Sequence, residues 1–270
     1  MASDGGRCGM LIATFFPVVT KTALRYIDTC ELRMKPLRNE TRPPNIAVLA
    51  VLTILALPVA AKAERLPALF EGDNPDRIFQ NLVEFPDISG NASVMMLCAS
   101  QVEGSGKMKD TFCYIRNNAD FTYNEAIQKA AKKALLKPAT IDGKRQKIYL
   151  QFRVEFTKKD EEKHIIVHLN TGDAENLEAY GPDFIAAQRV IGKERWMKVC
   201  PLRADFALTA RAHVSVEGVG SNVSLAHGYG IVPTGNCQQA IVDTIEQSPF
   251  IPAMVDGEAV PSAFVEPFGN

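Results

Sequence analysis

The sequence predicts an α+β fold built from two tandem copies of one small unit. Three observations lead to this prediction: an internal repeat, strand-like alternation around a glycine-containing loop, and a helix followed by a proline and an Asp-Gly turn. The chain has 270 residues, a formal net charge of −1 and 46% hydrophobic residues. That length and composition suit one or two globular domains.

The internal repeat is visible when the sequence is compared with itself at a shift of 114 positions. Residues 102–143 then align with residues 216–257 without a gap, and ten of the 42 positions are identical. Glycine, proline and Asp-Gly are the residues that turns require. We therefore predict structural roles for Gly104, Gly106, Pro138, Asp142 and Gly143 in copy one, and for Gly218, Gly220, Pro252, Asp256 and Gly257 in copy two.

Alternating apolar residues predict a hairpin in each copy. In copy two they alternate from Phe206 to Val216 and again from Val223 to Ile231. A period of two is typical of half-buried strands, and the intervening glycine-containing loop at 217–222 joins them. Copy one has the same layout around its own Val-Glu-Gly loop.

A helix and a last strand are expected after each hairpin. Thr122 and Asn236 are expected to cap the two helices in capping boxes. The last strands are predicted over 147–156 in copy one and 260–268 in copy two. Each unit is thus expected to be a small antiparallel sheet with helices on one face.

The remaining segments complete the predicted domain organisation. Residues 164–169 are expected to form a further strand, joined to the last strand of copy one by a turn at 158–163. Residues 76–83 and 183–190, before the two hairpins, have an ambiguous helical pattern. The expected domains are therefore 64–156 and 178–270, with 157–177 as a hairpin extension and linker.

The first 63 residues are expected to lie outside the fold. Ile46–Ala61 is apolar, follows basic residues near Met34, and is followed by an Ala-Lys-Ala site, the three parts of a secretory signal. Residues 34–63 are therefore predicted to be a signal peptide cleaved before Glu64, and residues 1–33 a dispensable extension. The alternative is an uncleaved membrane anchor.

Four cysteines follow the predicted cleavage site, and two disulfides are expected in an oxidising compartment. Placing Val216 opposite Val223 in copy two, and shifting each strand by 114, puts Cys98 opposite Cys113 in copy one. Cys200 and Cys237 then pair by elimination. The alternative is that all four are buried free thiols.

A hairpin, a helix followed by Pro-Ala, then Asp-Gly and a strand ending in an aromatic residue resembles the C-terminal domain of TonB. The resemblance is carried by Leu136–Ala139 with Asp142-Gly143, and by Phe250–Ala253 with Asp256-Gly257. It implies a periplasmic protein whose edge strand pairs with an extended peptide of a partner. It also implies, as an alternative, an inner-membrane-anchored energy transducer for outer-membrane transport, although the chain lacks a proline-rich spacer.

The pairing edge expected from this resemblance is the last strand of each copy. In copy one the strand at 164–169 is expected to cover that edge, so pairing should favour copy two. Pro261 and Pro267 lie in the last strand of copy two, where each removes a backbone donor.

The sequence contains no phosphate-binding loop, dinucleotide fingerprint, metalloprotease motif or paired Cys-x-x-Cys. We therefore expect no catalytic residue, metal or cofactor, and a protein or peptide as the partner. The near-neutral charge argues against nucleic acid, and a membrane is a partner only if the apolar segment is uncleaved. The alternative class is an exported small-ligand binder or enzyme with its site between the copies.

Overall fold

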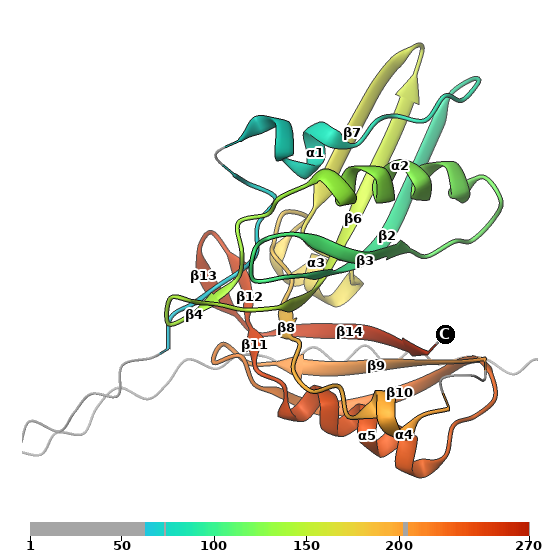
Figure 1. Ribbon diagram of the computed structural model, residues 1–270. Coiled ribbons are helices and arrows are strands. Elements are labelled where there is room, and N and C mark those ends of the chain that lie inside the picture. The colour runs from blue at the N-terminus through green and yellow to red at the C-terminus, as the bar shows by residue number, and fades with distance from the viewer. Residues whose placement is uncertain (1–62, 73, 202–204, 270) are drawn as a thin grey trace, which may run out of the picture. The chain divides into compact units, whose positions relative to one another are not determined.

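A computed structural model describes residues 63–72, 74–201 and 205–269, and shows a mixed α+β protein of mostly antiparallel sheets with few helices (Figure 1). The expected fold class is confirmed at this level. The predicted signal peptide lies outside the described residues, apart from Ala63.

Copy one comprises nine elements. They are β1 (Arg65–Leu66), η1 (Pro75–Arg77), α1 (Phe79–Leu82), β2 (Ala92–Val102), β3 (Met108–Cys113), α2 (Asp120–Lys133), β4 (Thr140–Ile141), β5 (Lys144–Arg145) and β6 (Ile148–Lys159).

A linking segment and copy two follow. The linking segment holds β7 (Glu162–His168) and α3 (Ala174–Tyr180). Copy two comprises β8 (Gln188–Val190), α4 (Trp196–Val199), β9 (Phe206–Val214), β10 (Gly220–Gly230), α5 (Gly235–Gln247), β11 (Phe250–Ile251), β12 (Ala253–Val255), β13 (Glu258–Val260) and β14 (Ser262–Gly269).

The two copies repeat one connection order. In copy one β2 pairs with both β3 and β6, and in copy two β9 pairs with both β10 and β14, all antiparallel. Figure 1 shows α2 across the sheet of copy one and α5 across β9 and β10. The small β4–β5 hairpin has its counterpart in β12–β13. The order of elements is therefore duplicated, while the predicted domain boundaries stay a prediction.

Each copy has an aromatic-rich hydrophobic core. In copy one Phe152 lies edge-on to Phe79, with ring centroids 5.3 Å apart, and in copy two Phe250 lies edge-on to Phe264 at 5.0 Å. All buried residues of both cores lie between Ala68 and Phe268, and both disulfides lie within that range. Both hydrophobic cores and both disulfides of the described chain thus fall within residues 64–270, the predicted mature protein.

Strand β6 is buried on both faces, so its sequence does not alternate. Its even-numbered residues, such as Leu150, belong to the core beneath α2. Its odd-numbered residue Tyr149 belongs to the core of copy two, where its ring lies 6.5 Å from that of Phe264. Copy two therefore covers the face of this sheet that α2 leaves free.

The copies are also joined by strand pairing. β8 pairs with β6 on one side and with β11 on the other, which extends the sheet of copy one to six strands. Arg189 of β8 donates two hydrogen bonds of 2.7 Å to the carboxylate of Glu266 on β14, and both side chains are buried.

The ambiguous pattern at 76–83 corresponds to η1 and α1, as expected, but the pattern at 183–190 does not form a helix. That segment is extended: Ile185 bridges to Met254, and β8 follows. Its apolar residues are divided between two different cores, so their spacing along the sequence fits neither a helix nor a strand clearly. The helix of copy two before its hairpin is α4, further along the chain.

Candidate functional site

Two glycines hold each hairpin loop against the segment after the helix. Gly106 has φ +84° and Gly218 has φ +72°, and a Cβ at either position would lie 2.1 Å from the carbonyl oxygen of Leu136 or Phe250. Their carbonyl groups accept hydrogen bonds from the N–H groups of these same two residues. Gly218 is therefore the structural counterpart of Gly106, not of Gly104.

This equivalence corrects the alignment of the two copies. The two hairpins align at a shift of 112 residues, because the facing pair Val102–Met108 of copy one corresponds to the facing pair Val214–Gly220 of copy two. The same bulge follows in both, at Asp110 and Asn222, each with positive φ. The shift becomes 114 after this point, so copy two has two additional residues between Leu225, the counterpart of Cys113, and the part of α5 that aligns at this shift.

The remaining motif residues lie at turns and tight contacts. Asp142-Gly143 and Asp256-Gly257 all have positive φ and form the tips of the β4–β5 and β12–β13 hairpins. Pro138 and Pro252 each precede a fully buried alanine. Gly220 packs against the Phe250 ring, and Gly104 lies beside Arg145.

Both expected disulfides are present. Cys98 faces Cys113 in the β2–β3 ladder with Cα atoms 4.0 Å apart, and Cys200 joins the end of α4 to Cys237 at the start of α5. The expected register of copy two is wrong, however: Val216 does not face Val223, and Leu225 faces Ala210. The predicted pairing of Cys98 with Cys113 is nevertheless correct, because the error in the hairpin register of copy two and the error in the shift between the copies cancel.

The expected helix caps are also displaced. α5 begins after Thr234, whose hydroxyl accepts from the Cys237 N–H, instead of at Asn236. α2 begins at Asp120, whose carboxylate accepts from the backbone N–H and the guanidinium of Arg116. Burial raises the pKa of Asp120, but these hydrogen bonds lower it more, so the net pKa is lowered.

The expected pairing edge of copy one is covered. β6 pairs with β2 on one side, and its other side pairs with β7 and β8. Coverage by the following strand was expected, and the structure shows this pairing together with that of β8.

β14 is an end strand of its sheet, as expected, but side chains from elsewhere in the chain hydrogen-bond to its outward backbone groups. The Asn176 side chain donates to the Ala263 carbonyl at 2.8 Å and accepts from its N–H at 3.0 Å, as a residue of a neighbouring strand would. The Gln151 amide donates to the Val265 carbonyl. Pro267, which has no N–H, occupies the next outward position of the edge.

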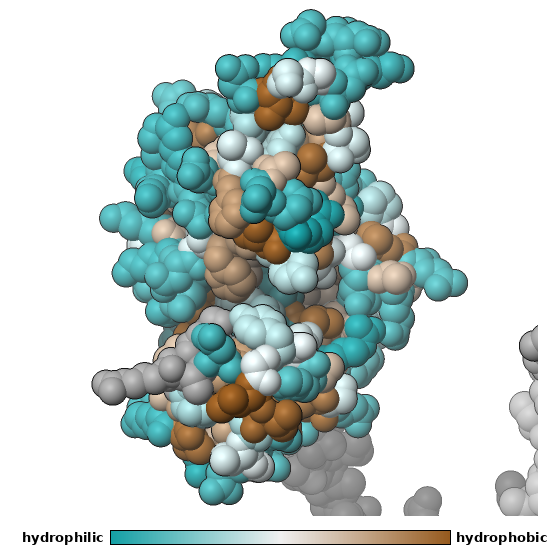
Figure 2. Space-filling model, turned by 90° about the vertical axis from the view of Figure 1, so that its right-hand side faces the viewer, coloured by the Kyte–Doolittle hydropathy of each residue, from teal (hydrophilic) through white to brown (hydrophobic). Residues whose placement is uncertain are grey.

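β10 is the other end strand of this sheet, and within the described residues no further strand pairs with it. Residues 219–232 contain no Asp, Glu, Lys or Arg. Three large apolar residues at its end are exposed by half or more: Tyr229 at 57%, Ile231 at 50% and Val232 at 68%. On the face drawn in Figure 2, hydrophobic side chains gather at the level of copy two among hydrophilic ones.

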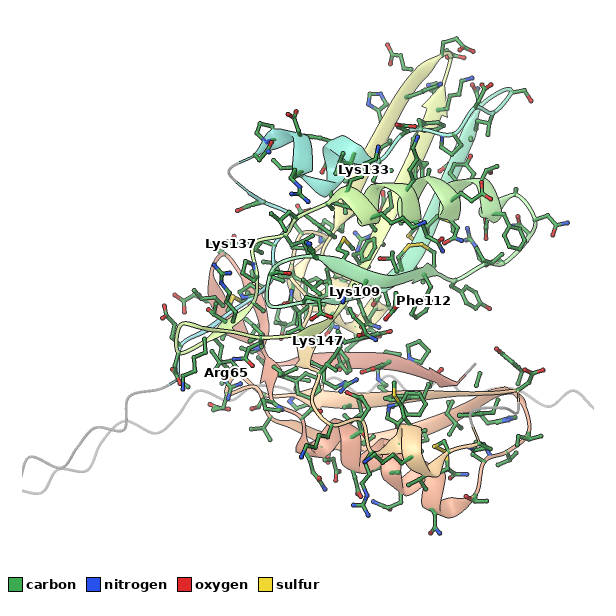
Figure 3. All side chains as sticks on the ribbon, viewed as in Figure 1. Arg65, Lys109, Phe112, Lys133, Lys137 and Lys147 are labelled. Carbon is green, nitrogen blue, oxygen red and sulfur yellow. A yellow bond between two sulfur atoms is a disulfide. The ribbon has the colours of Figure 1, made fainter. Side chains whose placement is uncertain are left out.

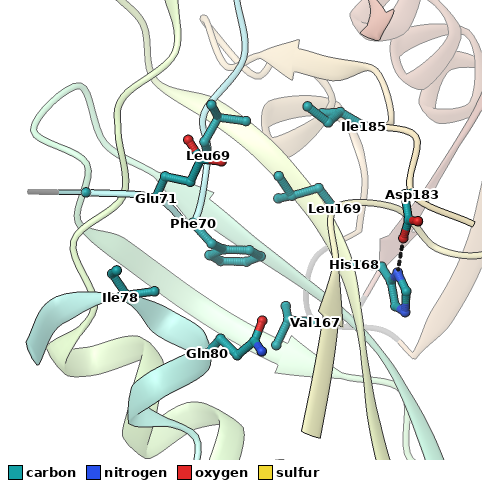
Figure 4. A pocket seen from close by; sticks show the side chains of 11 residues that line it. Leu69, Phe70, Glu71, Ile78, Gln80, Val167, His168, Leu169, Asp183 and Ile185 are labelled. Atoms are coloured by element: carbon teal, nitrogen blue, oxygen red, sulfur yellow. Dashed lines mark ion pairs between the residues drawn. The ribbon is translucent and has the colours of Figure 1, made fainter. Parts of the chain in front are cut away.

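A cavity of about 550 Å³ lies beside the end of β7 (Figure 4). Its apolar lining includes Phe70, Leu169 and Ile185, which come from three separate segments. At its rim the His168 ring lies 3.5 Å from Asp183 and 3.6 Å from Glu155. No sequence pattern indicated this cavity, because its lining residues are scattered along the chain.

No group of three or more His, Cys, Asp or Glu side chains in the described part of the chain could hold a metal ion. Within the same residues, no helix is long and apolar enough to cross a membrane. No protein-family model, curated protein or solved structure matches this chain.

Proposed function

We propose that the chain is an exported, non-catalytic binding protein that pairs the edge of β10 with an extended segment of another protein. The observation that carries this proposal is the open, charge-free edge of β10. The TonB-like order of hairpin, helix and strand supports it. The edge differs from the one that the resemblance implies, because the last strands of both copies are already paired or capped within the chain.

The backbone of β10 has the groups that strand pairing needs. Asn176 engages Ala263, so the backbone groups of its ladder partner His213 point toward β10. By the same alternation, Leu225 and His227 direct their N–H and C=O groups away from β9. A partner strand would bond to these groups and cover Tyr229.

An edge substitution tests the proposal. His227→Pro removes an outward N–H at an exposed edge position where proline is tolerated, whereas His227→Ala keeps that N–H. We expect a displayed library of 12-residue peptides, panned on residues 64–270, to yield binders of micromolar affinity. His227→Pro should weaken them at least tenfold and His227→Ala less than twofold. Binders that ignore both changes, or an absence of binders, would reject the proposal.

Export is tested separately. The two disulfides fit an oxidising compartment, and we propose the periplasm. N-terminal sequencing of the protein from fractionated cells should show a chain that begins at Glu64. A chain that retains Ile46–Ala61 would instead support the membrane-anchored energy transducer.

The cavity beside β7 favours a second candidate, an exported binder of a small apolar ligand. Leu169→Trp would fill the cavity, and we expect it to abolish any thermal stabilisation that a library of small apolar compounds produces. The control is Ile166→Trp, at an exposed position of strand β7, which ends just before Leu169. If no compound stabilises the parent protein, this second candidate is rejected.

A further inference from the structure

Unpaired basic side chains surround the tip of the β2–β3 hairpin. Four of them are exposed and make no ion pair within the described residues: Lys107, Lys137, Lys144 and Arg145. We call these four residues the basic rim. Figure 3 shows Lys137 together with Lys109, Lys133 and Lys147, which come from the neighbouring elements of copy one.

Backbone contacts bring the four rim residues together from distant parts of the sequence. Lys107 forms a β-bridge with Leu135, and the adjacent Gly106 packs against Leu136, next to Lys137. Gly104 of the same loop lies against Arg145, at the end of the β4–β5 hairpin that also carries Lys144. The four cations therefore border one continuous surface around the loop.

Few acidic groups neutralise this surface. Glu103 is shared by Lys109 at 3.5 Å and Lys147 at 3.3 Å, so that pair of lysines retains one net positive charge. Burial raises the pKa of Glu103, but the two lysines lower it more, consistent with a positive local potential. Glu64, Glu71 and Asp142 are also exposed nearby, and they reduce the excess of positive charge on this surface without removing it.

The chain enters the fold beside the rim, a few residues after an apolar segment in the sequence. Ile46–Ala61 ends two residues before Ala63, and β1 then pairs with β4 through Leu66 and Thr140. The Glu64 N–H donates to Asp142 at the tip of the β4–β5 hairpin. Arg65 of β1 faces Ile141 of β4, which in turn faces Lys144 of β5, so the chain enters the fold in the same small sheet that carries Lys144 and Arg145.

We propose that the basic rim binds the anionic phospholipid surface of the membrane through which the chain is exported. The apolar segment is joined to the fold a few residues before β1, so export brings the rim to that membrane. The proposal departs from the sequence-based expectation, in which a membrane is a partner only if the segment is uncleaved, because here the rim itself binds the lipid. The interaction is electrostatic, because the rim contributes charges and no exposed large apolar side chain among its four residues. It is separate from β10, which belongs to copy two.

Each rim cation is expected to contribute about 1 kcal/mol near an anionic surface, which is roughly a fivefold change in affinity. Neutralising all four should therefore reduce binding by more than a hundredfold at low salt. Raising the salt from roughly 0.02 M to 0.5 M should abolish binding of the parent protein, because the Debye length falls to a few ångströms.

The experiment is cosedimentation of residues 64–270 with vesicles of phosphatidylcholine alone or mixed with phosphatidylglycerol. The test variant carries Lys107→Gln, Lys137→Gln, Lys144→Gln and Arg145→Gln. A matched control neutralises four exposed lysines elsewhere, Lys159→Gln, Lys163→Gln, Lys193→Gln and Lys198→Gln. Circular dichroism and free-thiol assays establish that each variant is folded and disulfide-bonded.

We expect the parent and the control to sediment with anionic vesicles at low salt, and the rim variant to stay in solution. Equal sedimentation of the rim variant, or no sedimentation of the parent, would overturn the proposal. So would tighter binding to soluble polyphosphate than to vesicles of equal phosphate concentration, since a free polyanion would then be the ligand. None of these outcomes depends on peptide binding at β10.

Discussion

At the scale of single residues, the hairpin loops depend on two glycines that serve two purposes at once. Gly106 and Gly218 have positive φ, and each also lies against a backbone carbonyl that cannot move aside easily. Gly143 has a similar φ of +72° but open space around it. Substitutions at these three positions therefore distinguish the cost of a positive φ from the cost of a steric clash with the backbone.

We expect Gly106→Ala and Gly218→Ala each to lower the free energy of unfolding by more than about 2 kcal/mol. Gly143→Ala should cost only about 1 kcal/mol, the typical penalty of the left-handed conformation alone. Urea unfolding of the oxidised protein measures the difference. Equal costs at all three positions would show that the carbonyl contacts are relaxed in solution.

Asp120 predicts a dependence of stability on pH. Its pKa is lowered in the folded state, so it stabilises the fold above its unfolded pKa, and this contribution is lost as the pH falls through the folded pKa. Asp120→Asn should cost about 1 kcal/mol at pH 7, and the difference from the parent should shrink below about pH 4. Glu125→Gln, at an exposed position of the same helix, should change stability little at either pH. A deficit independent of pH would contradict this account.

Residue types alone indicated where the turns lie but not which residue caps each helix. Thr122 and Asn236 have suitable side chains, but Thr234 caps α5, and the N-cap of α2 is Ala119, which makes no side-chain capping hydrogen bond. The choice depends on Arg116 and on the path of the chain leaving β3 and β10. Those are tertiary features that a local pattern does not contain.

At the scale of elements, the repeat predicted the order of hairpin, helix and strand, but not the hairpin register. Alternation specifies a face and leaves slips by two residues open. The bulges at Asp110 and Asn222 and the loop contacts with Leu136 and Phe250 set the register. An ungapped comparison could not show the two additional residues before α5.

The observed register predicts a disulfide that the chain lacks. Ala210 and Leu225 occupy the positions of Cys98 and Cys113. We therefore expect Ala210→Cys with Leu225→Cys to form a bridge, detected by non-reducing peptide mapping. Ala212→Cys with His227→Cys, the pair that the expected register would bring together, should remain reduced. A bridge in the second variant alone would show that β10 is paired as the sequence first suggested.

At the scale of the whole chain, the main surprise lies in how the copies pack together. The sequence of β6 could not show that copy two buries its second face, because a strand buried on both faces has no period of two. The same packing covers the edge of β14, through Gln151 of β6 and Asn176 of α3. The candidate pairing edge is therefore that of β10 and not that of β14. The sequence pattern of one copy cannot show this, because it depends on how the two copies pack together.

The buried Arg189–Glu266 pair tests this packing. Burial raises the pKa of Glu266, and Arg189 opposes that shift. Arg189→Met leaves a buried carboxylate without its partner and should cost about 3–5 kcal/mol at pH 7, whereas Arg189→Met with Glu266→Leu should recover most of that loss. The loss from Arg189→Met should also shrink as the pH falls, because a carboxyl with a raised folded pKa favours the fold when protonated.

Arg211→Met is the matched control, since Arg211 is 41% exposed and pairs with Asp173 and Glu175 near the surface. It should cost about 1 kcal/mol or less. Urea unfolding from pH 4 to pH 8 distinguishes the variants. If Arg189→Met cost no more than Arg211→Met, water would reach Glu266, and the two copies would be less tightly joined than the structure shows. If Arg189→Met with Glu266→Leu were as unstable as Arg189→Met alone, the loss of stability would come from lost packing of the Arg189 side chain and not from the unpaired carboxylate.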